Sequence, residues 1–302
     1  MSAVRQIELP REFESRIRRR EPMSKHTSWH VGGPADIWFE PQDRADLAQF
    51  LRLLPRDVPL HWVGLGSNLL VRDGGLRGVV IATHGALGRL DRLASNTVYG
   101  EAGVPCARIA RQAIKWGLGP ADFFAGIPGT LGGALAMNAG AFGGETWNHV
   151  LDVEVIDRSG HMQKRDASEY HVSYRHVQPP AAEEWFLSAT LRFEQRPGAS
   201  NDELKALLTR RKESQPIGEW SCGSVFTNPP GDHAARLIDA SGLKGFHIGG
   251  ASVSAKHANF IINGGDATAE DLERLIAHVQ ATVEQVHGVR LVTEVRIVGE
   301  RA

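Results

Sequence analysis

Strand-like and helical spacings of apolar residues follow one another along the first part of the chain. Short apolar runs predict strands over 35–39, 61–63 and 79–82, and a longer amphipathic run predicts a helix over 43–54. Pro105 precedes apolar residues spaced three and four apart, which predicts a helix from there to Gly117. This part of the chain is therefore expected to mix α and β structure.

The alternation continues toward the C-terminus. A β-rich stretch is expected from Val150 to Phe193, and the polar, turn-rich segment 195–201 is the best candidate for a domain boundary. Beyond it we predict helices over 203–213, 234–240 and 269–287, and strands over 224–226, 251–253, 260–262 and 292–298. A chain of 302 residues is expected to form more than one domain, because single cores rarely grow beyond about 250 residues.

The charge balance argues against polyanionic and membrane partners. The 34 Lys and Arg residues nearly balance the 35 Asp and Glu residues, so no long-range field favours nucleic acid or an anionic membrane surface. The one dense basic cluster, Arg16–Arg20, is expected to form the solvated face of a short N-terminal helix. No apolar run is long enough to cross a bilayer. We therefore expect neither nucleic-acid binding nor membrane insertion, and an anionic ligand must be held locally.

The cysteine and histidine pattern does not indicate a metal site. Cys106 and Cys222 are the only cysteines and lie far apart, and the 13 histidines show no HExxH or similar paired spacing. Few cysteines and an N-terminus without the apolar core of a secretory signal indicate a reducing, cytoplasmic environment. We expect no bound metal and a cytoplasmic protein.

Two glycine-rich loops carry the strongest chemical signal. The first, over 64–71, follows a predicted strand, and the second extends from Ala125 to Glu145 and contains Thr130, which is able to cap a helix that runs to Met137. Bare backbone N–H groups in such loops can approach a pyrophosphate closely. Neither loop matches GxGxxG or GxxxxGK[ST], which weakens the Rossmann and P-loop interpretations. A tight structural turn explains the first loop at least as well, whereas the glycine density of the second favours a ligand lying against backbone.

A series of motifs occurs in order along nearly the whole chain. They are Thr27–Asp36, Gly66–Val71, Ala125–Thr130, Met137–Ala141, Ser173–Arg175, Ser214–Pro216, Cys222–Phe226, Asn228–Pro229, Lys256–Asn263 and Glu294–Arg296. Together they resemble the motifs of the UDP-N-acetylenolpyruvoylglucosamine reductase family. The length resembles that of its shorter class, which lacks an extra substrate-covering insertion.

This resemblance implies an α+β fold and an FAD cofactor. The expected parts are an FAD-binding region of the vanillyl-alcohol-oxidase type made of two α/β subdomains, over 1–85 and 86–197, and a C-terminal α+β substrate-binding domain over 198–302. FAD is expected to be non-covalent, because 64–71 contains no histidine that could tether it. By motif position, the residues expected to bind the cofactor are Gly64, Leu65, Gly66, Ser67, Asn68, Leu69, Gly126, Ile127, Pro128, Gly129, Thr130, Gly133, Asn138, Ala139 and Gly140.

The resemblance also implies a reaction, in which NADPH reduces the enolpyruvyl ether of UDP-N-acetylglucosamine through FAD during peptidoglycan precursor synthesis. Hydride addition to the terminal carbon leaves negative charge beside the substrate carboxylate, so the site must stabilise an enediolate and then protonate its carbon. Arg175 and Glu294 resemble the family's carboxylate-polarising pair, and Ser224 resembles its proton donor. The expected substrate-binding residues are Tyr174, Asn228 and Lys256.

The sequence departs from the family pattern at two places, and two alternative functions stay open. Leu65 stands where the family commonly has Gly, and His176–Pro180 replaces a short Ser-containing continuation after Arg175. Neither departure removes a proposed catalytic residue. Without the resemblance, Ser224 would be a turn residue. The alternative functions are an FAD-linked oxidase of the same superfamily and a catalytically silent flavin- or nucleotide-sugar-binding paralogue.

Overall fold

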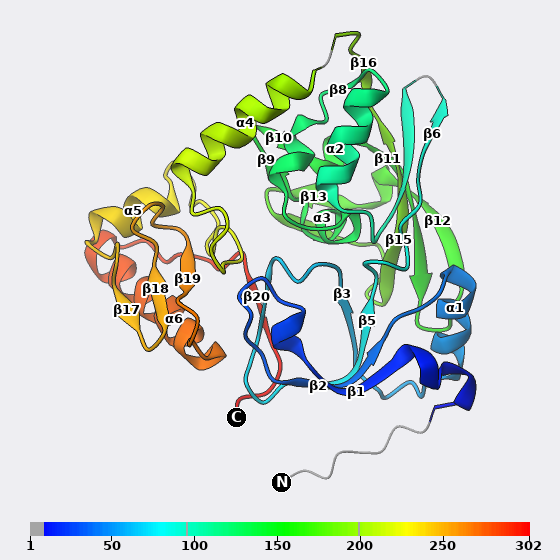
Figure 1. Ribbon diagram of the computed structural model, residues 1–302, viewed down its shortest axis with the longest axis horizontal. Coiled ribbons are helices and arrows are strands. Elements are labelled where there is room, and N and C mark those ends of the chain that lie inside the picture. Colours follow the sequence, from blue (N-terminus) through cyan, green and yellow to red (C-terminus); the bar gives the residue numbers. More distant parts are fainter. Residues whose placement is uncertain (1–8, 95, 199) are drawn as a thin grey trace. The chain divides into compact units, whose positions relative to one another are not determined.

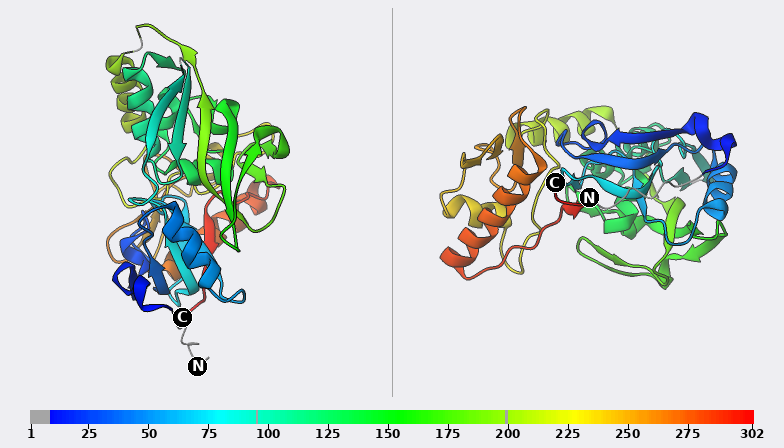
Figure 2. Two further views of the ribbon diagram at one scale, coloured as in Figure 1. Left: turned by 90° about the vertical axis from the view of Figure 1, so that its right-hand side faces the viewer. Right: turned by 90° about the horizontal axis from the view of Figure 1, so that it is seen from below.

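The computed structural model describes residues 9–94, 96–198 and 200–302, whose helices and strands are drawn in Figures 1 and 2. The described chain forms two compact units. The first contains 9–19, Ile37–Leu65 and Gly78–Leu208, and the second contains Arg20–Asp36, Gly66–Arg77 and Thr209–Ala302. The three-part division expected from the sequence stays a prediction.

The first unit is built around a five-stranded antiparallel sheet. Its strands are β6 (Leu90–Ala94), β7 (Thr97–Glu101), β11 (Val150–Asp157), β12 (Met162–Asp166) and β15 (Glu184–Arg192), in the order β12-β11-β15-β7-β6. β15 is thus inserted between two hairpins that precede it in the chain. The expected β-rich stretch from Val150 to Phe193 is confirmed.

Helices α2 (Cys106–Lys115) and α3 (Leu131–Met137) complete the main core of this unit. The residues of α2 that become buried include Ile109, Ala110 and Ala113, which have the spacing of three and four that predicted the helix. α3 packs on β15 and β7 (Figure 1). One apolar cluster therefore joins both helices to the sheet.

A second core of this unit involves α1 (Arg44–Leu53) and the parallel pair of β3 (Leu60–Val63) and β5 (Leu76–Ala82). These strands belong to a sheet with the order β1-β2-β5-β3, in which β1 is Ile17–Pro22 and β2 is Pro34–Phe39. The rings of Phe39 and Phe50 stack with centroids 3.8 Å apart, and Phe13 meets both edge-on. This aromatic cluster holds α1 against the strands.

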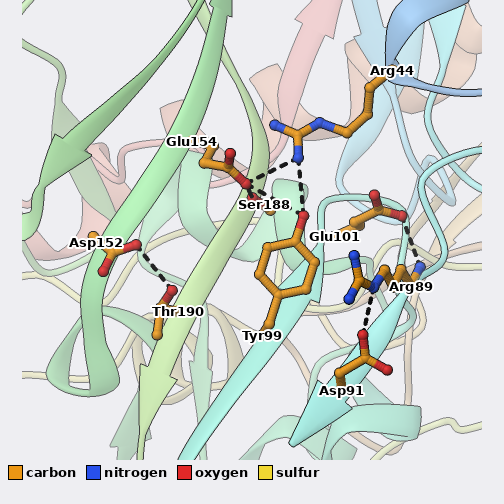
Figure 3. A network of polar contacts seen from close by, with 9 residues as sticks. All are labelled: Arg44, Arg89, Asp91, Tyr99, Glu101, Asp152, Glu154, Ser188 and Thr190. Carbon is orange, nitrogen blue, oxygen red and sulfur yellow. Dashed lines mark hydrogen bonds and ion pairs between the residues drawn. The ribbon is translucent and has the colours of Figure 1, made fainter. Parts of the chain in front are cut away.

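A polar network also attaches α1 to the five-stranded sheet (Figure 3). Arg44 Nη1 donates hydrogen bonds to Glu154 Oε2 on β11 at 3.0 Å and to the hydroxyl oxygen of Tyr99 on β7 at 3.1 Å. Ser188 on β15 donates to the same carboxylate oxygen. Burial alone would raise the pKa of Glu154, but the hydrogen bonds from Arg44 and Ser188 outweigh it and lower the pKa. Glu154 therefore stays ionised and links the helix to three neighbouring strands.

The second unit contains a three-stranded antiparallel sheet, β17 (His247–Ile248), β18 (Ala251–Val253) and β19 (Ile261–Asn263). α6 (Ala269–His287) packs on β17 and β18 and against α5 (Ala234–Ala240). The carboxylate of Asp73 accepts hydrogen bonds from the first two N–H groups of α6. Separately, β4 (Leu69–Val71) pairs in parallel with β20 (Arg296–Val298), which brings the C-terminal strand to the end of the first glycine loop.

In the described part of the chain, the remaining elements are one further α-helix, three pairs of short strands and the 3-10 helices. They are α4 (Asn201–Ser214), the strand pairs β8 (Leu118–Gly119) with β16 (Glu194–Gln195), β9 (Gly140–Ala141) with β10 (Gly144–Glu145) and β13 (His171–Ser173) with β14 (His176–Gln178), and the 3-10 helices Arg11–Arg16, Met23–Lys25, Asp122–Gly126, Thr146–His149 and Ala167–Glu169. Within the described ranges, no helix combines the length and apolarity that a membrane crossing needs.

Three predictions fail in the kind or extent of the element. The bounds of α5, α6 and β18 agree with those expected, and the other predicted helices and strands differ by a few residues at their ends. Arg16–Arg20 forms no helix beyond the 3-10 turn that ends at Arg16, and β1 begins at the next residue. The strand expected over 292–298 is confined to β20. The described residues 224–226 form only one bridge, from Phe226 to Thr293, because the N–H and C=O of Phe226 bond to the side chain of Asn259 instead of to a strand.

Candidate active site

The two glycine-rich loops meet within the first unit at Gly64 and Thr130. A Cβ added to Gly64 would lie 2.4 Å from Thr130 Oγ1, so only glycine lets the Thr130 side chain pack there. Thr130 is buried, and its Oγ1 has no hydrogen-bond partner among the described residues. A buried hydroxyl without a partner is unfavourable unless a ligand supplies one. The unpartnered hydroxyl is an available donor beside the glycine loops, and the cofactor-binding role of Gly64 and Thr130 stays a prediction.

The expected capping role of Thr130 is wrong. Thr130 occupies the N-cap position of α3, but its side chain makes no capping hydrogen bond. The N–H groups of Leu131 and Gly132 instead donate to the carbonyls of Val104 and Ala102, both at 2.8 Å. Because these carbonyls accept hydrogen bonds from the first turn of α3, the hydroxyl of Thr130 is not used as a cap.

The tight contact at Gly64 gives a testable expectation. Gly64→Ala should lower the melting temperature and the amount of FAD retained, because the new methyl displaces Thr130, and overpacking of this kind typically costs about 1–3 kcal/mol. Gly88→Ala is the control, since a Cβ there meets nothing within 4 Å. Thermal melting and flavin absorbance per protein measure both effects. Equal values for the two variants would contradict the proposed contact.

Asn138, expected to bind the cofactor, uses its side chain inside the protein. Its Nδ2 donates to Glu145 Oε2 at 2.9 Å and to the carbonyl of Ser173 at 3.2 Å, and its Oδ1 accepts from the N–H of Trp147 at 3.1 Å. It caps α3 in the left-handed conformation with φ 48° and is buried. The side chain therefore connects the end of the second glycine loop to the β13–β14 hairpin.

Arg175 lies in the turn of that hairpin, and the same loop fixes its guanidinium. Nη1 donates to the carbonyl of Asn138 at 3.2 Å and Nη2 to the carbonyl of Gly140 at 2.9 Å, with Glu145 Oε1 at 3.6 Å. The guanidinium also lies 4.8 Å from the ring centre of the exposed Tyr174. The structure thus brings together four residues that the sequence assigned to different roles, Asn138, Gly140, Tyr174 and Arg175.

In the second unit, the backbone segments that carry Ser224 and Glu294 are hydrogen-bonded neighbours. The N–H of Glu294 donates to the carbonyl of Val225 at 2.8 Å, next to Ser224. Asn68 Nδ2 donates to the carbonyl of Glu294 at 3.0 Å, and the carbonyl of Asn68 accepts from the N–H of Arg296 at 3.2 Å. Asn68, predicted to bind cofactor, is therefore also attached to the Glu294 segment.

Cys222 lies in the apolar core of the second unit, close to these segments. Burial raises the pKa of its thiol well above the ordinary value, and the charge of Glu294 raises it further. The thiol therefore stays protonated, which agrees with its interpretation as a small packing residue. Cys106 is buried in the first unit, where burial likewise raises the pKa of its thiol.

The two remaining predicted substrate ligands of this unit are occupied by contacts within it. Asn228 Oδ1 accepts a hydrogen bond from the N–H of Ala234 at 3.1 Å, at the start of α5. Lys256 is exposed, and its Nζ donates to the carbonyl of Lys212. The structure does not gather these two side chains with Ser224, and their substrate-binding role stays a prediction.

Sequence reasoning assigned no role to two residues that the structure connects to the site. Glu145 contacts both Asn138 and Arg175, and Asn259 bonds the backbone beside Ser224. Both stand in or next to quoted motifs, but their partners are distant in sequence. Among the described residues there is no group of three His, Cys, Asp or Glu side chains suited to hold a metal ion.

Comparison with known proteins defines first the class and then the family. A family model described as "FAD binding domain" matches residues 35–165, which places the chain among FAD-dependent oxidoreductases. A second model, "UDP-N-acetylenolpyruvoylglucosamine reductase, C-terminal domain", matches residues 215–298. The chain belongs to the UDP-N-acetylenolpyruvoylglucosamine reductase family, because it is 57% identical to the reductase of Alkalilimnicola ehrlichii over 99% of both chains.

Further relatives agree with this assignment. The reductase of Methylococcus capsulatus is 56% identical and covers 93% of this chain and 92% of its own. The crystal structure of UDP-N-acetylenolpyruvylglucosamine reductase from Thermus caldophilus matches with a TM-score of 0.78 and 31% identity, over 91% of this chain and 97% of that chain. The expected fold class, an FAD-binding region followed by a substrate-binding domain, is confirmed.

Proposed function

We propose that the chain reduces the enolpyruvyl ether of UDP-N-acetylglucosamine to UDP-N-acetylmuramate, a step of peptidoglycan precursor synthesis. The observation that carries this proposal is the 57% identity, over 99% of both chains, to a relative that bears the name of this reductase. NADPH is the proposed reductant. FAD, when bound, would accept a hydride from NADPH and deliver it to the terminal carbon of the substrate.

The glycine loops are proposed to hold FAD by its diphosphate. Support comes from the buried Thr130 Oγ1, which has no partner among the described residues, and from Gly64, where a Cβ would clash with Thr130. Non-covalent binding is supported by the absence of histidine from 64–71. These residues would orient the cofactor without contributing to the redox chemistry.

Arg175 and Glu294 are proposed to act on the substrate carboxylate. Negative charge develops there when hydride reaches the neighbouring carbon, and a preorganised guanidinium stabilises it without a reorganisation cost. The two backbone carbonyls that hold Arg175 support this role, because they fix the guanidinium in advance. For Glu294, support comes from its anchoring on both backbone sides by Val225 and Asn68.

Ser224 is proposed to donate the proton that completes the reduction. A hydroxyl is a weak acid, so it can serve only because the enediolate is a strong base. Gly223 precedes it with φ 80°, a left-handed conformation that aims the following residue and that favours glycine. Tyr174, Asn228 and Lys256 are proposed to bind the substrate, and for Lys256 this requires release of its hydrogen bond to Lys212.

The proposed location is the cytoplasm, where NADPH and the nucleotide sugar occur. The small number of cysteines, two in the whole sequence, supports it, because disulfide-rich sequences are typical of oxidising compartments. The proposed partner is the small-molecule UDP-sugar substrate.

An anaerobic spectral titration tests the function. NADPH should bleach the visible flavin absorbance of the purified protein, and the enolpyruvyl ether of UDP-N-acetylglucosamine should then restore it with formation of one UDP-N-acetylmuramate per flavin. Reoxidation by oxygen after bleaching with a small alcohol would instead favour a superfamily oxidase. A protein that binds FAD and the UDP-sugar but shows neither change would be the silent paralogue.

A further inference from the structure

Asn259 is a buried asparagine whose side chain makes both of its hydrogen bonds to one backbone residue. It lies between β18 and β19 and is 4% exposed. Its Oδ1 accepts from the N–H of Phe226 at 3.0 Å, and its Nδ2 donates to the carbonyl of Phe226 at 2.8 Å. Its own carbonyl accepts from the N–H of Val225 at 2.9 Å. Asn259 thus makes the hydrogen bonds to Val225 and Phe226 that a neighbouring strand would otherwise make.

The opposite edge of segment 225–227 is hydrogen-bonded to residues 292–294, which we call the Glu294 strip. The N–H of Glu294 donates to the carbonyl of Val225 at 2.8 Å, and the N–H of Thr227 donates to the carbonyl of Val292 at 2.9 Å. Phe226 therefore faces Thr293 across an antiparallel bridge, with its own N–H and C=O pointing away toward Asn259. Asn259 and the Glu294 strip hold the segment from two sides.

The chemistry of this position requires a primary amide. Phe226 is 2% exposed, so its N–H and C=O would both be unsatisfied without a partner. Among neutral side chains, Asn and Gln offer a fixed donor and acceptor in one plane, and the short side chain of Asn loses little freedom when it is held there. A hydroxyl can satisfy only one of the two groups well.

We propose that Asn259 is a positioning residue for the reduction of the UDP-sugar. By fixing Val225 and Phe226, it sets the backbone from which Ser224 projects and its distance to the Glu294 strip. This inference rests on the proposed roles of Ser224 and Glu294. It predicts that loss of Asn259 slows the step that needs Ser224 and leaves the earlier reaction with NADPH unchanged.

Asn263 provides a matched control in the same unit. It is 5% exposed, its Nδ2 donates to the carbonyl of Trp29 at 2.7 Å, and its Oδ1 accepts from the N–H groups of Gly265 and Ala267. The two asparagines are therefore equally buried and make similar bonds to backbone. Only Asn259 bonds the segment next to Ser224, so a general loss of stability affects both variants, whereas mispositioning affects one.

The experiment compares Asn259→Ala, Asn259→Ser and Asn263→Ala in the FAD-loaded enzyme. Anaerobic stopped-flow absorbance measures bleaching by NADPH and then reoxidation by the UDP-sugar. Displacement of a reacting group by about 1 Å can cost about 100-fold in rate, so reoxidation should slow about 10- to 100-fold in Asn259→Ala and less in Asn259→Ser. Bleaching should stay within about twofold of the unmodified rate. Asn263→Ala should lower the melting temperature but leave both rates close to normal.

A double-mutant cycle separates positioning from general damage. If Asn259 acts through Ser224, Asn259→Ala should slow reoxidation far less in a Ser224→Ala background than in the unmodified enzyme. The inference would be overturned if the effects of Asn259→Ala and Ser224→Ala on reoxidation were fully additive. It would also be overturned if Asn263→Ala slowed reoxidation as much as Asn259→Ala. If Asn259→Ala does not fold, Asn259→Ser carries the same comparison. A normal reoxidation rate in Ser224→Ala alone would instead refute the proposed role of Ser224.

Discussion

Ser224→Ala should lose about 10²- to 10⁴-fold in turnover with the UDP-sugar, which is the usual contribution of a positioned proton donor. FAD content and the rate of bleaching by NADPH should stay near normal, because neither needs a proton delivered to the substrate. Single-turnover reoxidation under anaerobic conditions measures the loss directly. In heavy water, the unmodified enzyme should place deuterium on the carbon next to the carboxylate.

Two further variants test whether the hydroxyl of Ser224 is the proton donor. Ser224→Cys should retain more activity than Ser224→Ala, since a thiol at the same position can still donate a proton. Ser221→Ala, three residues earlier and likewise partly buried, should change neither half of the reaction. If Ser224→Ala turned over at the unmodified rate, Ser224 would be a turn residue after Gly223, and the proton donor would lie elsewhere.

Arg175→Ala should slow reoxidation by the UDP-sugar about 10²- to 10³-fold, the range found when one preorganised donor to a developing negative charge is removed. Its guanidinium is fixed by the carbonyls of Asn138 and Gly140, so the charge is in place before substrate arrives. Bleaching by NADPH should be little changed, because NADPH presents no carboxylate to it. Arg175→Lys should recover part of the rate, since Lys keeps the charge but loses the double contact.

Arg158 supplies the matched control for this prediction. Its guanidinium is also held by two backbone carbonyls of the first unit, those of Pro55 and Val58. Arg158→Ala should therefore cost stability of a similar kind while both half-reactions proceed normally. The assignment of Arg175 would be wrong if Arg175→Ala blocked bleaching by NADPH but left reoxidation intact.

Local sequence patterns predicted the helices and strands well. They did not predict where distant residues make hydrogen bonds that local residues could have made. The apolar spacing of α2 lies within the helix, and the caps of α6, Thr268 and Gly288, are its neighbours in sequence, so local patterns reveal both helices. Thr130 has the right type and place for a cap, but the carbonyls of Ala102 and Val104 reach the first turn of α3 instead. Nothing near Thr130 in sequence signals that competition.

Contacts between distant residues likewise limited what could be predicted of the candidate site. Motif resemblance indicated Asn138 and Arg175 separately, yet their connection spans 37 residues and depends on the β13–β14 hairpin. The predicted strand at Ser224–Phe226 has suitable apolar residues, but its partner on one edge is a side chain 33 residues away. Periodicity cannot distinguish a strand from an extended segment that a buried asparagine completes.

The burial of both cysteines has a practical consequence for handling the enzyme. Reduced flavin that reacts with oxygen releases hydrogen peroxide, which oxidises cysteine through the thiolate. Burial raises the pKa of Cys106 and of Cys222, so the thiolate is scarce at neutral pH and poorly accessible to the oxidant. Oxidative loss of activity through these cysteines should therefore be slow, and aerobic purification should not need a thiol reductant on their account.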